Sequence, residues 1–187
     1  MPRLIRYDRL KPVPWKNGAG TTREIWKLLH AAGTPAIRIS VAEISGDQAF
    51  STFPGIDRII MQLDGPAMDL VIDGTRHGLQ PAVPLPFAGE AAVSCTLRTP
   101  GTAHDLNLMC DRSLFRGTMV VKNLQAGEAV ALPSPAVLTA VLALAPCTLH
   151  APEPASLGLY DVLLVETSEP PRAATPAKLA ILTAQAL

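Results

Sequence analysis

The sequence is short of the residues that build covalent or metal-held frameworks. It has three cysteines among 187 residues. Cys95, Cys110 and Cys147 are odd in number, widely spaced and without a CxxC pair, which argues against a disulfide framework and a zinc knuckle. We therefore expect free, buried thiols in a reducing cytoplasm.

Histidines are equally dispersed. His30, His77, His104 and His150 show no HxH or HxxxH spacing, so we expect no metal site and no cofactor. A GxSxG motif is also missing, so the sequence predicts no serine nucleophile of the hydrolase type. Any chemistry would have to come from a metal-free polar pocket.

Runs of one charge and long apolar runs are missing as well. Lys and Arg together number 16, as do Asp and Glu, and no basic run exceeds two residues. We therefore expect neither nucleic acid nor a membrane surface as a partner. The most apolar stretch, Ala136–Ala145, is about half the length of a bilayer span and indicates buried core. Met1–Tyr7 lacks the apolar segment of a secretory signal, which favours a cytoplasmic protein.

Turn-forming residues, by contrast, are abundant, with 18 prolines and 13 glycines. They leave little room for helices of about 11–12 residues. The pieces between them alternate or run apolar, as in Ile37–Ile44, Ala92–Leu97 and Leu159–Glu166. About ten short strands separated by turns predict an all-β sandwich or barrel.

Two local patterns are more specific. Asp73-Gly74 lies between Met68–Ile72 and Arg76–Leu79 and predicts a hairpin turn. Thr22–Ala32 fits an amphipathic helix or a strand edge, and we favour the strand. Both predictions follow from residue type and periodicity alone.

Polar residues concentrate in the first part of the chain. They cluster among apolar residues up to Arg116, whereas Leu124–Leu187 is rich in Ala, Leu, Val and Pro. We expect 1–187 to form one unit with two halves. The half 1–116 would carry a polar pocket, and the half 117–187 would be apolar scaffold or oligomer surface.

The densest polar segment is Val13–Ile25. Gly18 and Gly20 permit positive φ or a close approach of ligand to backbone, but a lysine precedes them and no GK[ST] follows, so this is not a phosphate loop. A tight loop that leads into a strand is the structural alternative. The functional candidates from this segment are Trp15, Asn17, Thr22 and Glu24.

Two alternating segments could supply the walls of a pocket. Arg38 and Ser40 share one face of a strand, and Asp105, Asn107 and Met109 share one face of another. An inward arginine would need an anionic partner or ligand, because an unpaired buried charge is costly. Solvated outer faces, or polar residues at a barrel mouth, are the alternatives.

A third segment supplies Phe53, Asp57 and Arg58. On a strand the adjacent Asp57 and Arg58 face opposite sides, so each needs a partner elsewhere.

Five segments in this order resemble the HutD/Ves family of bacterial cupin-like proteins: WKNGAGTTREI, RISVAEI, FSTFPGIDR, PFAGE and DLNLM. They span Trp15–Met109, with weaker similarity to the C-terminus, and Ala19 and Leu106 depart from the usual glycine and phenylalanine. The resemblance implies an RmlC-type, cupin-like β-barrel without the metal-binding histidines of other cupins. It also implies two barrel halves in one chain (a bicupin), a homodimer, and a regulatory role in histidine utilisation.

The first hypothesis is a small-molecule-binding protein that holds an anionic carboxylate intermediate such as urocanate or formiminoglutamate. An alternative is a metal-independent isomerase or lyase that uses Asp105, Glu24 and His104. An obligate dimer that acts as a scaffold is the third. The expected ligand-binding residues are Trp15, Asn17, Thr22, Glu24, Arg38, Ser40, Phe53, Asp57, Arg58, Asp105, Asn107 and Met109.

Overall fold

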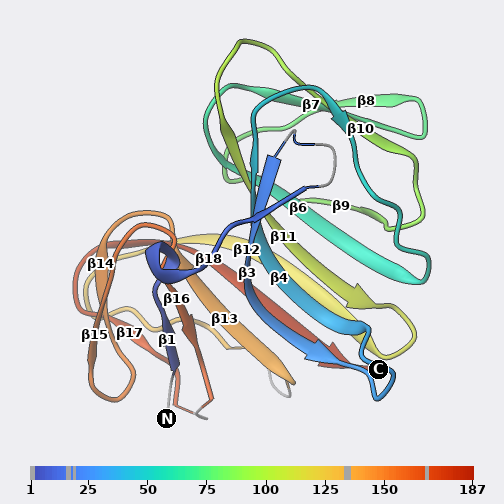
Figure 1. Ribbon diagram of the computed structural model, residues 1–187. Coiled ribbons are helices and arrows are strands. Elements are labelled where there is room, and N and C mark those ends of the chain that lie inside the picture. The colour runs from blue at the N-terminus through green and yellow to red at the C-terminus, as the bar shows by residue number, and fades with distance from the viewer. Residues whose placement is uncertain (1–2, 16–17, 19, 133–135, 167–168) are drawn as a thin grey trace. The chain divides into compact units, whose positions relative to one another are not determined.

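The computed structural model describes residues 3–15, 18, 20–132, 136–166 and 169–187 (Figure 1). In these residues all regular secondary structure is β-strand, apart from the 3-10 helix η1 (Tyr7–Arg9). The predicted all-β class is confirmed, and Thr22–Ala32 is strand, within β3 (Gly20–Leu29). The described part of the chain contains no helix with the length and hydrophobicity that a membrane span requires.

The chain divides into two compact units. The first unit is Lys11–Gly117, and the second unit combines Met1–Leu10 with Thr118–Leu187. This division differs from halves at 1–116 and 117–187 chiefly at the N-terminus. There β1 (Arg3–Ile5) pairs antiparallel with β16 (Val162–Leu164), which ties the start of the chain to the second unit.

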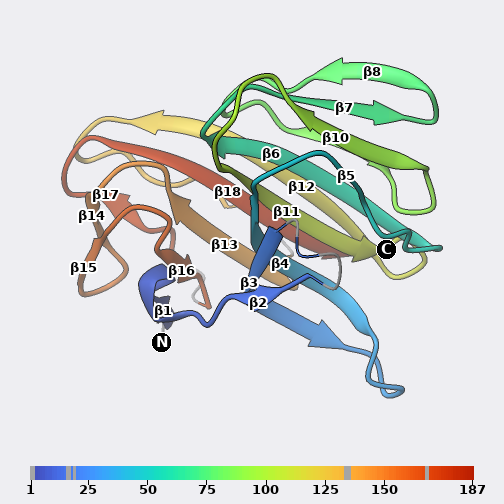
Figure 2. The same ribbon diagram turned by 45° about the horizontal axis from the view of Figure 1, so that its top comes forward.

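The first unit contains a six-stranded and a four-stranded antiparallel sheet. In spatial order the larger sheet consists of β2 (Val13–Pro14), β3, β4 (Pro35–Ile44), β11 (Ala103–Asp111), β6 (Ile56–Asp64) and β9 (Leu85–Ala88). The smaller one consists of β5 (Gln48–Ala49), β10 (Val93–Leu97), β7 (Met68–Ile72) and β8 (Thr75–Gly78). Figure 2 shows β7, β8 and β10 side by side.

An apolar core joins these two sheets. Ile44 and Ile60 from the larger sheet cluster with Met68, Leu70 and Val93 from the smaller one, and all five are buried. Burial of such side chains supplies about 1.5–3 kcal/mol each. The core therefore fixes which face of the six-stranded sheet points inward.

The predicted hairpin at Asp73-Gly74 is confirmed. Ile72 of β7 pairs with Thr75 of β8, and the two turn residues have φ of 48° and 82°. Positive φ at both central positions is what a two-residue hairpin turn requires, and Asp-Gly is a favoured pair for it.

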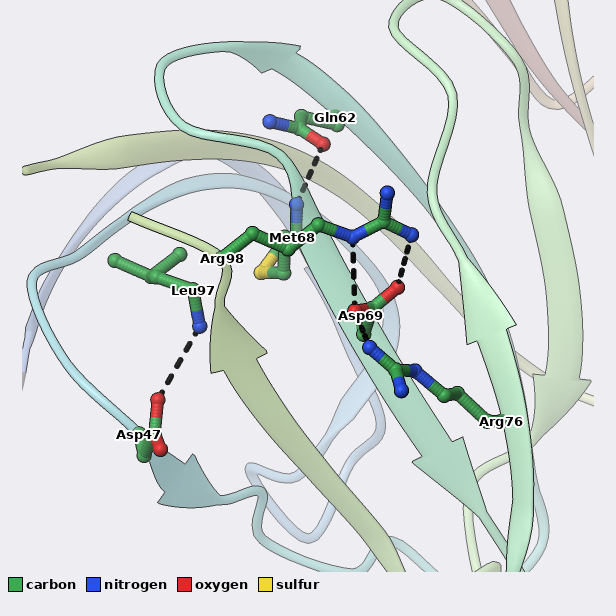
Figure 3. A network of polar contacts seen from close by, with 7 residues as sticks. All are labelled: Asp47, Gln62, Met68, Asp69, Arg76, Leu97 and Arg98. Carbon is green, nitrogen blue, oxygen red and sulfur yellow. Dashed lines mark hydrogen bonds and ion pairs between the residues drawn. The ribbon is translucent and has the colours of Figure 1, made fainter. Parts of the chain in front are cut away.

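On the face of β7 opposite the core, two arginines cover Asp69 (Figure 3). Arg98 donates from Nε (2.9 Å) and Nη2 (2.6 Å), and Arg76 donates from Nη2. These hydrogen bonds hold the pKa of Asp69 well below its usual range. Gly78 stands opposite Asp69, where a Cβ would lie 2.8 Å from Arg98 Nη2. The two arginines thus bury the Asp69 carboxylate on this face of the smaller sheet.

The second unit contains a five-stranded and a three-stranded sheet. The former has the order β1, β16, β13 (Leu138–Ala143), β18 (Ala177–Ala186), β12 (Phe115–Leu124), and the latter β15 (Pro154–Leu157), β14 (Cys147–His150), β17 (Arg172–Ala173). Their shared core is apolar and includes Val141, Leu149, Leu163, Leu179 and Ile181. The apolar stretch near residue 140 is therefore buried core, as predicted.

Candidate functional site

A cavity of about 730 Å³ lies on the inner face of the six-stranded sheet. All of its lining residues belong to the first unit. They are Val13, Pro14, Trp15, Thr22, Glu24, Lys27, Arg38, Ser40, Ala42, Ala49, Phe50, Ser51, Phe53, Arg58, Asp105, Asn107 and Met109.

Strand register brings the polar members of this lining together. Asn107 on β11 stands opposite Ser40 on β4, and Ser40 stands opposite Glu24 on β3. On the other side of β11, Met109 stands opposite Arg58 on β6. Because side chains alternate along each strand, one row of residues from four neighbouring strands faces the same hollow.

A buried chain of three polar side chains occupies the centre. Arg58 Nη2 donates to Asn107 Oδ1 (2.7 Å), and Asn107 Nδ2 donates to Asp105 Oδ1. Their exposed fractions are 7%, 5% and 0%. Within the described residues, Arg58 Nε and Asp105 Oδ2 have no hydrogen-bond partner. The hydrogen bonding of these three side chains is therefore incomplete, since buried polar groups in proteins are normally paired.

Burial changes the pKa of both charged groups, Asp105 and Arg58. Burial raises the pKa of Asp105 to about 7, against the opposing pull of the Arg58 charge. Burial likewise lowers the pKa of Arg58 to about 10, against the pull of Asp105. Arg58 thus stays charged near neutrality, while Asp105 can change its charge there.

Three phenylalanine rings surround the guanidinium of Arg58. Its Cζ lies 5.4 Å from the ring centre of Phe50, 5.6 Å from that of Phe53 and 4.8 Å from that of Phe87. Phe87 stands directly opposite Arg58 in the pairing of β6 with β9. Cation–π contacts of this kind favour the charged arginine in an otherwise apolar enclosure.

A glycine fixes the loop that carries Phe53. The Phe53 N–H donates to Gly89 O, and the Gly89 N–H donates to Ile56 O, both at 2.7 Å. A Cβ at Gly89 would lie 2.5 Å from Phe53 O, so no larger residue fits. Steric restriction therefore explains why the PFAGE segment has glycine at position 89.

Glu24 pairs with two cations beside the polar centre. It accepts from Arg38 Nε (3.0 Å) and lies 2.7 Å from Lys27 Nζ, and all three side chains are partly exposed. Burial alone would raise the pKa of Glu24, but hydrogen bonds from Lys27 and Arg38 lower it. One carboxylate thus pairs with two cations, so this ion cluster keeps a net positive charge beside the polar centre.

Trp15 closes another part of the wall. Its Nε1 donates to Thr22 Oγ1 (2.6 Å), and its ring meets Phe50 edge to face at 6.4 Å. A Cβ at Gly20 would lie 2.5 Å from Glu43 O and 3.1 Å from the indole, so the indole packs against a position that only glycine can occupy.

The sequence-predicted site residues mostly converge. The structure places ten of them in the lining of this cavity: Trp15, Thr22, Glu24, Arg38, Ser40, Phe53, Arg58, Asp105, Asn107 and Met109. Asn17 lies outside the described residues.

Two candidate positions are corrected. Asp57 is exposed on the opposite side of β6 from Arg58 and lies 3.0 Å from Arg112 Nε, so it takes no part in the cavity. His104, a residue of the enzyme alternative, is not in the lining either. Its Nδ1 lies 2.6 Å from Asp64 Oδ1.

Sequence reasoning missed several lining residues, most notably Lys27. With regular alternation Lys27 and Glu24 would face opposite sides. The register shifts at Ile25, so that Glu24 pairs with Ser40 while Lys27 pairs with Arg38. Such a β-bulge redirects side chains and leaves no clear mark in a single sequence. Phe50 was visible in the FSTFPGIDR segment and could have been added.

Other chemistry-bearing groups lie apart from this centre. Among the described residues no three His, Cys, Asp or Glu side chains are grouped as a metal site would need. Cys95, Cys110 and Cys147 are free and buried.

Comparison with known proteins assigns the family. The model of the HutD family matches residues 7–182. The chain is 33% identical over 174 residues to an uncharacterised 21.2 kDa protein in the hutC 3′ region of Pseudomonas putida, covering 89% of this chain and 87% of the relative. It is 39% identical over 112 residues to Protein Ves of Citrobacter koseri, which covers 58% of this chain but only 59% of that relative.

Solved structures agree with this assignment. HutD from Pseudomonas fluorescens SBW25 (formate condition) superposes with a TM-score of 0.83 at 27% identity, over 99% of this chain and 100% of that one. A cupin 2 conserved barrel domain protein from Leptotrichia buccalis gives a TM-score of 0.65 at 11% identity, over 99% and 96%. The latter likeness concerns the fold alone. The chain therefore belongs to the HutD family and has a cupin-like all-β fold.

Proposed function

We propose that this protein binds a small carboxylate metabolite in the cavity of the first unit and serves a regulatory role in histidine utilisation. The observation that carries the proposal is Arg58. It is a buried, charged guanidinium in the lining of a cavity; its Nη2 donates to Asn107, and its Nε has no hydrogen-bond partner within the described residues. A buried cation with spare donors favours an anion, and the guanidinium fork suits a carboxylate.

Size and shape support a metabolite rather than a macromolecule. The cavity volume of about 730 Å³ falls within the usual range for small-molecule sites, about 300–1,000 Å³. Urocanate or formiminoglutamate would place its carboxylate at Arg58 and its nitrogen end near Asn107 and Asp105. Phe53 would pack on a flat ligand. The link to histidine utilisation rests on the family and on the relative named for the hutC 3′ region.

Calorimetric titration with urocanate and with formiminoglutamate tests this proposal. We expect one of them to bind the wild-type protein, and Arg58→Met to weaken binding by about 2–5 kcal/mol, because the charged partner of the carboxylate is lost. Arg112→Met is the matched control, since Arg112 lies outside the cavity and should leave affinity unchanged. No heat from any histidine-derived carboxylate at millimolar concentration would refute the proposal.

Catalysis by a metal-independent isomerase or lyase is the second candidate. Asp105 favours it, since a pKa near 7 suits a general acid or base, and Glu24 also lines the cavity. Turnover of urocanate or a sugar acid in the presence of a chelator, abolished by Asp105→Asn, would establish this function. Unchanged substrate after prolonged incubation would exclude these reactions.

We also propose that the two units are the two barrels of a bicupin. Each unit pairs one larger with one smaller β-sheet over an apolar core, which supports the idea. The homodimer and the cytoplasmic location stay predictions. Sedimentation equilibrium at micromolar concentration checks the first, and cell fractionation checks the second.

A further inference from the structure

The centre of the cavity places one buried cation and one buried acid on a single hydrogen-bonded chain. Asn107 accepts from Arg58 and donates to Asp105, so its side-chain amide bridges the two charged groups. Asp105 is fully buried, and its Oδ2 has no partner among the described residues. Arg58 is thus the main source of stabilisation for an ionised Asp105.

The other titratable groups around Asp105 are few. Glu24 and Lys27 on β3 and Arg38 on β4 form a mutually paired, partly exposed cluster, in which water screens the excess positive charge. On β10, burial raises the pKa of the Cys95 thiol to about 11, so it is neutral near pH 7. Of these groups, Arg38 acts on the pair, because its charge adds to the effect of burial in lowering the pKa of Arg58.

A bound carboxylate disturbs that balance. It competes with Asp105 for the charge of Arg58 and displaces water from the cavity, so that two anions would share one guanidinium in a dry site. Like charges in such a site favour protonation of one of them. Resting on the proposed function, we propose that the cavity takes up one proton, on Asp105, when a carboxylate binds at Arg58.

The proton balance defines the effect on affinity. Protein with ionised Asp105, the carboxylate anion and one proton combine to give a complex with neutral Asp105. Below pH 6 Asp105 already carries its proton, so affinity is constant. Above pH 7 each complex must acquire a proton from solution, and Kd rises by about tenfold per pH unit. The fraction of protein with bound carboxylate therefore depends on both pH and carboxylate concentration.

Acetate is the probe for this inference, because it stays ionised above pH 6 and carries no hydrogen-bond donor. Kd is measured between pH 6 and 9 from tryptophan fluorescence, since Trp15 lines the cavity. We expect a flat profile near pH 6 and a rise of about tenfold per unit between pH 7 and 9. Asp105→Asn, which is permanently neutral, should bind acetate with a flat profile throughout.

Two matched variants separate Asp105 from its neighbours. Glu24→Gln removes the other carboxylate of the lining, and His104→Gln removes a histidine adjacent in sequence but outside the cavity. Both should keep the slope. If Asp105→Asn does not fold, the ¹³C shift of the Asp105 carboxyl in the wild type, with and without acetate, reports the same protonation.

Three results would overturn the inference. Acetate binding with equal Kd from pH 6 to 9 would show that no proton is taken up, while leaving the carboxylate site itself intact. A persistent slope in Asp105→Asn would assign the proton to another group. Absence of acetate binding at pH 6 would also overturn it, and the calorimetry with urocanate and formiminoglutamate would then judge the proposed function separately.

Discussion

The two units have similar frames and different interiors. Each has a larger and a smaller β-sheet, but Val141, Leu149 and Leu163 pack in the core of the second unit, whereas the first unit has a cavity lined by Arg58 and Asp105. The first unit thus places buried polar side chains beside its apolar core. The sheets provide the frame, and the residue types at a few inward positions decide whether the interior is packed core or binding site.

The largest expected effect concerns the apolar core of the second unit. Leu149 is completely buried in the core of the second unit. Leu149→Ala should lower the free energy of unfolding by about 2–5 kcal/mol, because it removes apolar contacts and leaves a cavity. Urea denaturation measures this loss, and carboxylate binding by the folded fraction should not change. The exposed neighbour His150→Ala is the control, and an equal loss there would contradict this account of the core.

A triple replacement would make the first unit resemble the second. Arg58→Met, Asp105→Leu and Asn107→Leu together replace the polar chain by apolar side chains. Stability should hold or rise by about 1–4 kcal/mol, since the burial of charges is costly, while carboxylate binding disappears. Asn107→Leu alone should instead cost about 1–3 kcal/mol, because it removes a hydrogen-bond partner from both charges. A stable triple variant that still binds carboxylates would show that these three polar residues do not form the binding site.

The buried Asp105 of the first unit should also make the stability of the protein depend on pH. The folded pKa of Asp105, about 7, exceeds the value of an unfolded aspartate, about 3.9. Between these values the folded protein holds a proton that the unfolded chain has released, so this group's contribution to stability falls as pH rises from about 4 to 7. We expect the stability of Asp105→Asn relative to wild type to increase across that window in thermal melts at several pH values. A constant difference would contradict the raised pKa.

The smallest effect concerns the wall of the cavity. Thr22→Val removes the acceptor of the Trp15 indole N–H. The free energy of unfolding should fall by about 0.5–1.5 kcal/mol, as for a single hydrogen bond, and the fluorescence of Trp15 should shift to longer wavelength. Thr102→Val, at an exposed position outside the cavity, serves as the control. An unshifted spectrum would show that Thr22 does not hold the indole.

Much of the site could be predicted from alternation alone. The rule that residues two apart share a face grouped Arg38 with Ser40, and Asp105 with Asn107 and Met109, and all of these line the cavity. The family motifs predicted the cupin-like fold. These features are local, because a strand's own periodicity encodes them.

What could not be predicted depends on strand pairing. Asp57 is an exception, because alternation along β6 already predicts that it faces away from Arg58, and the structure places it on the outer side. Lys27 enters the cavity only because of the bulge at Ile25, which the pairing of β3 with β4 reveals. Phe87 reaches Arg58 through the pairing of β6 with β9. Contacts between strands far apart in sequence leave no periodic signal in either strand.

A crystal structure of the protein soaked with urocanate would show whether Arg58 binds a carboxylate. We expect the urocanate carboxylate within hydrogen-bond distance of Arg58, beside the rings of Phe50 and Phe53. Urocanate bound elsewhere, or a cavity that stays empty at a concentration shown by calorimetry to be saturating, would contradict it.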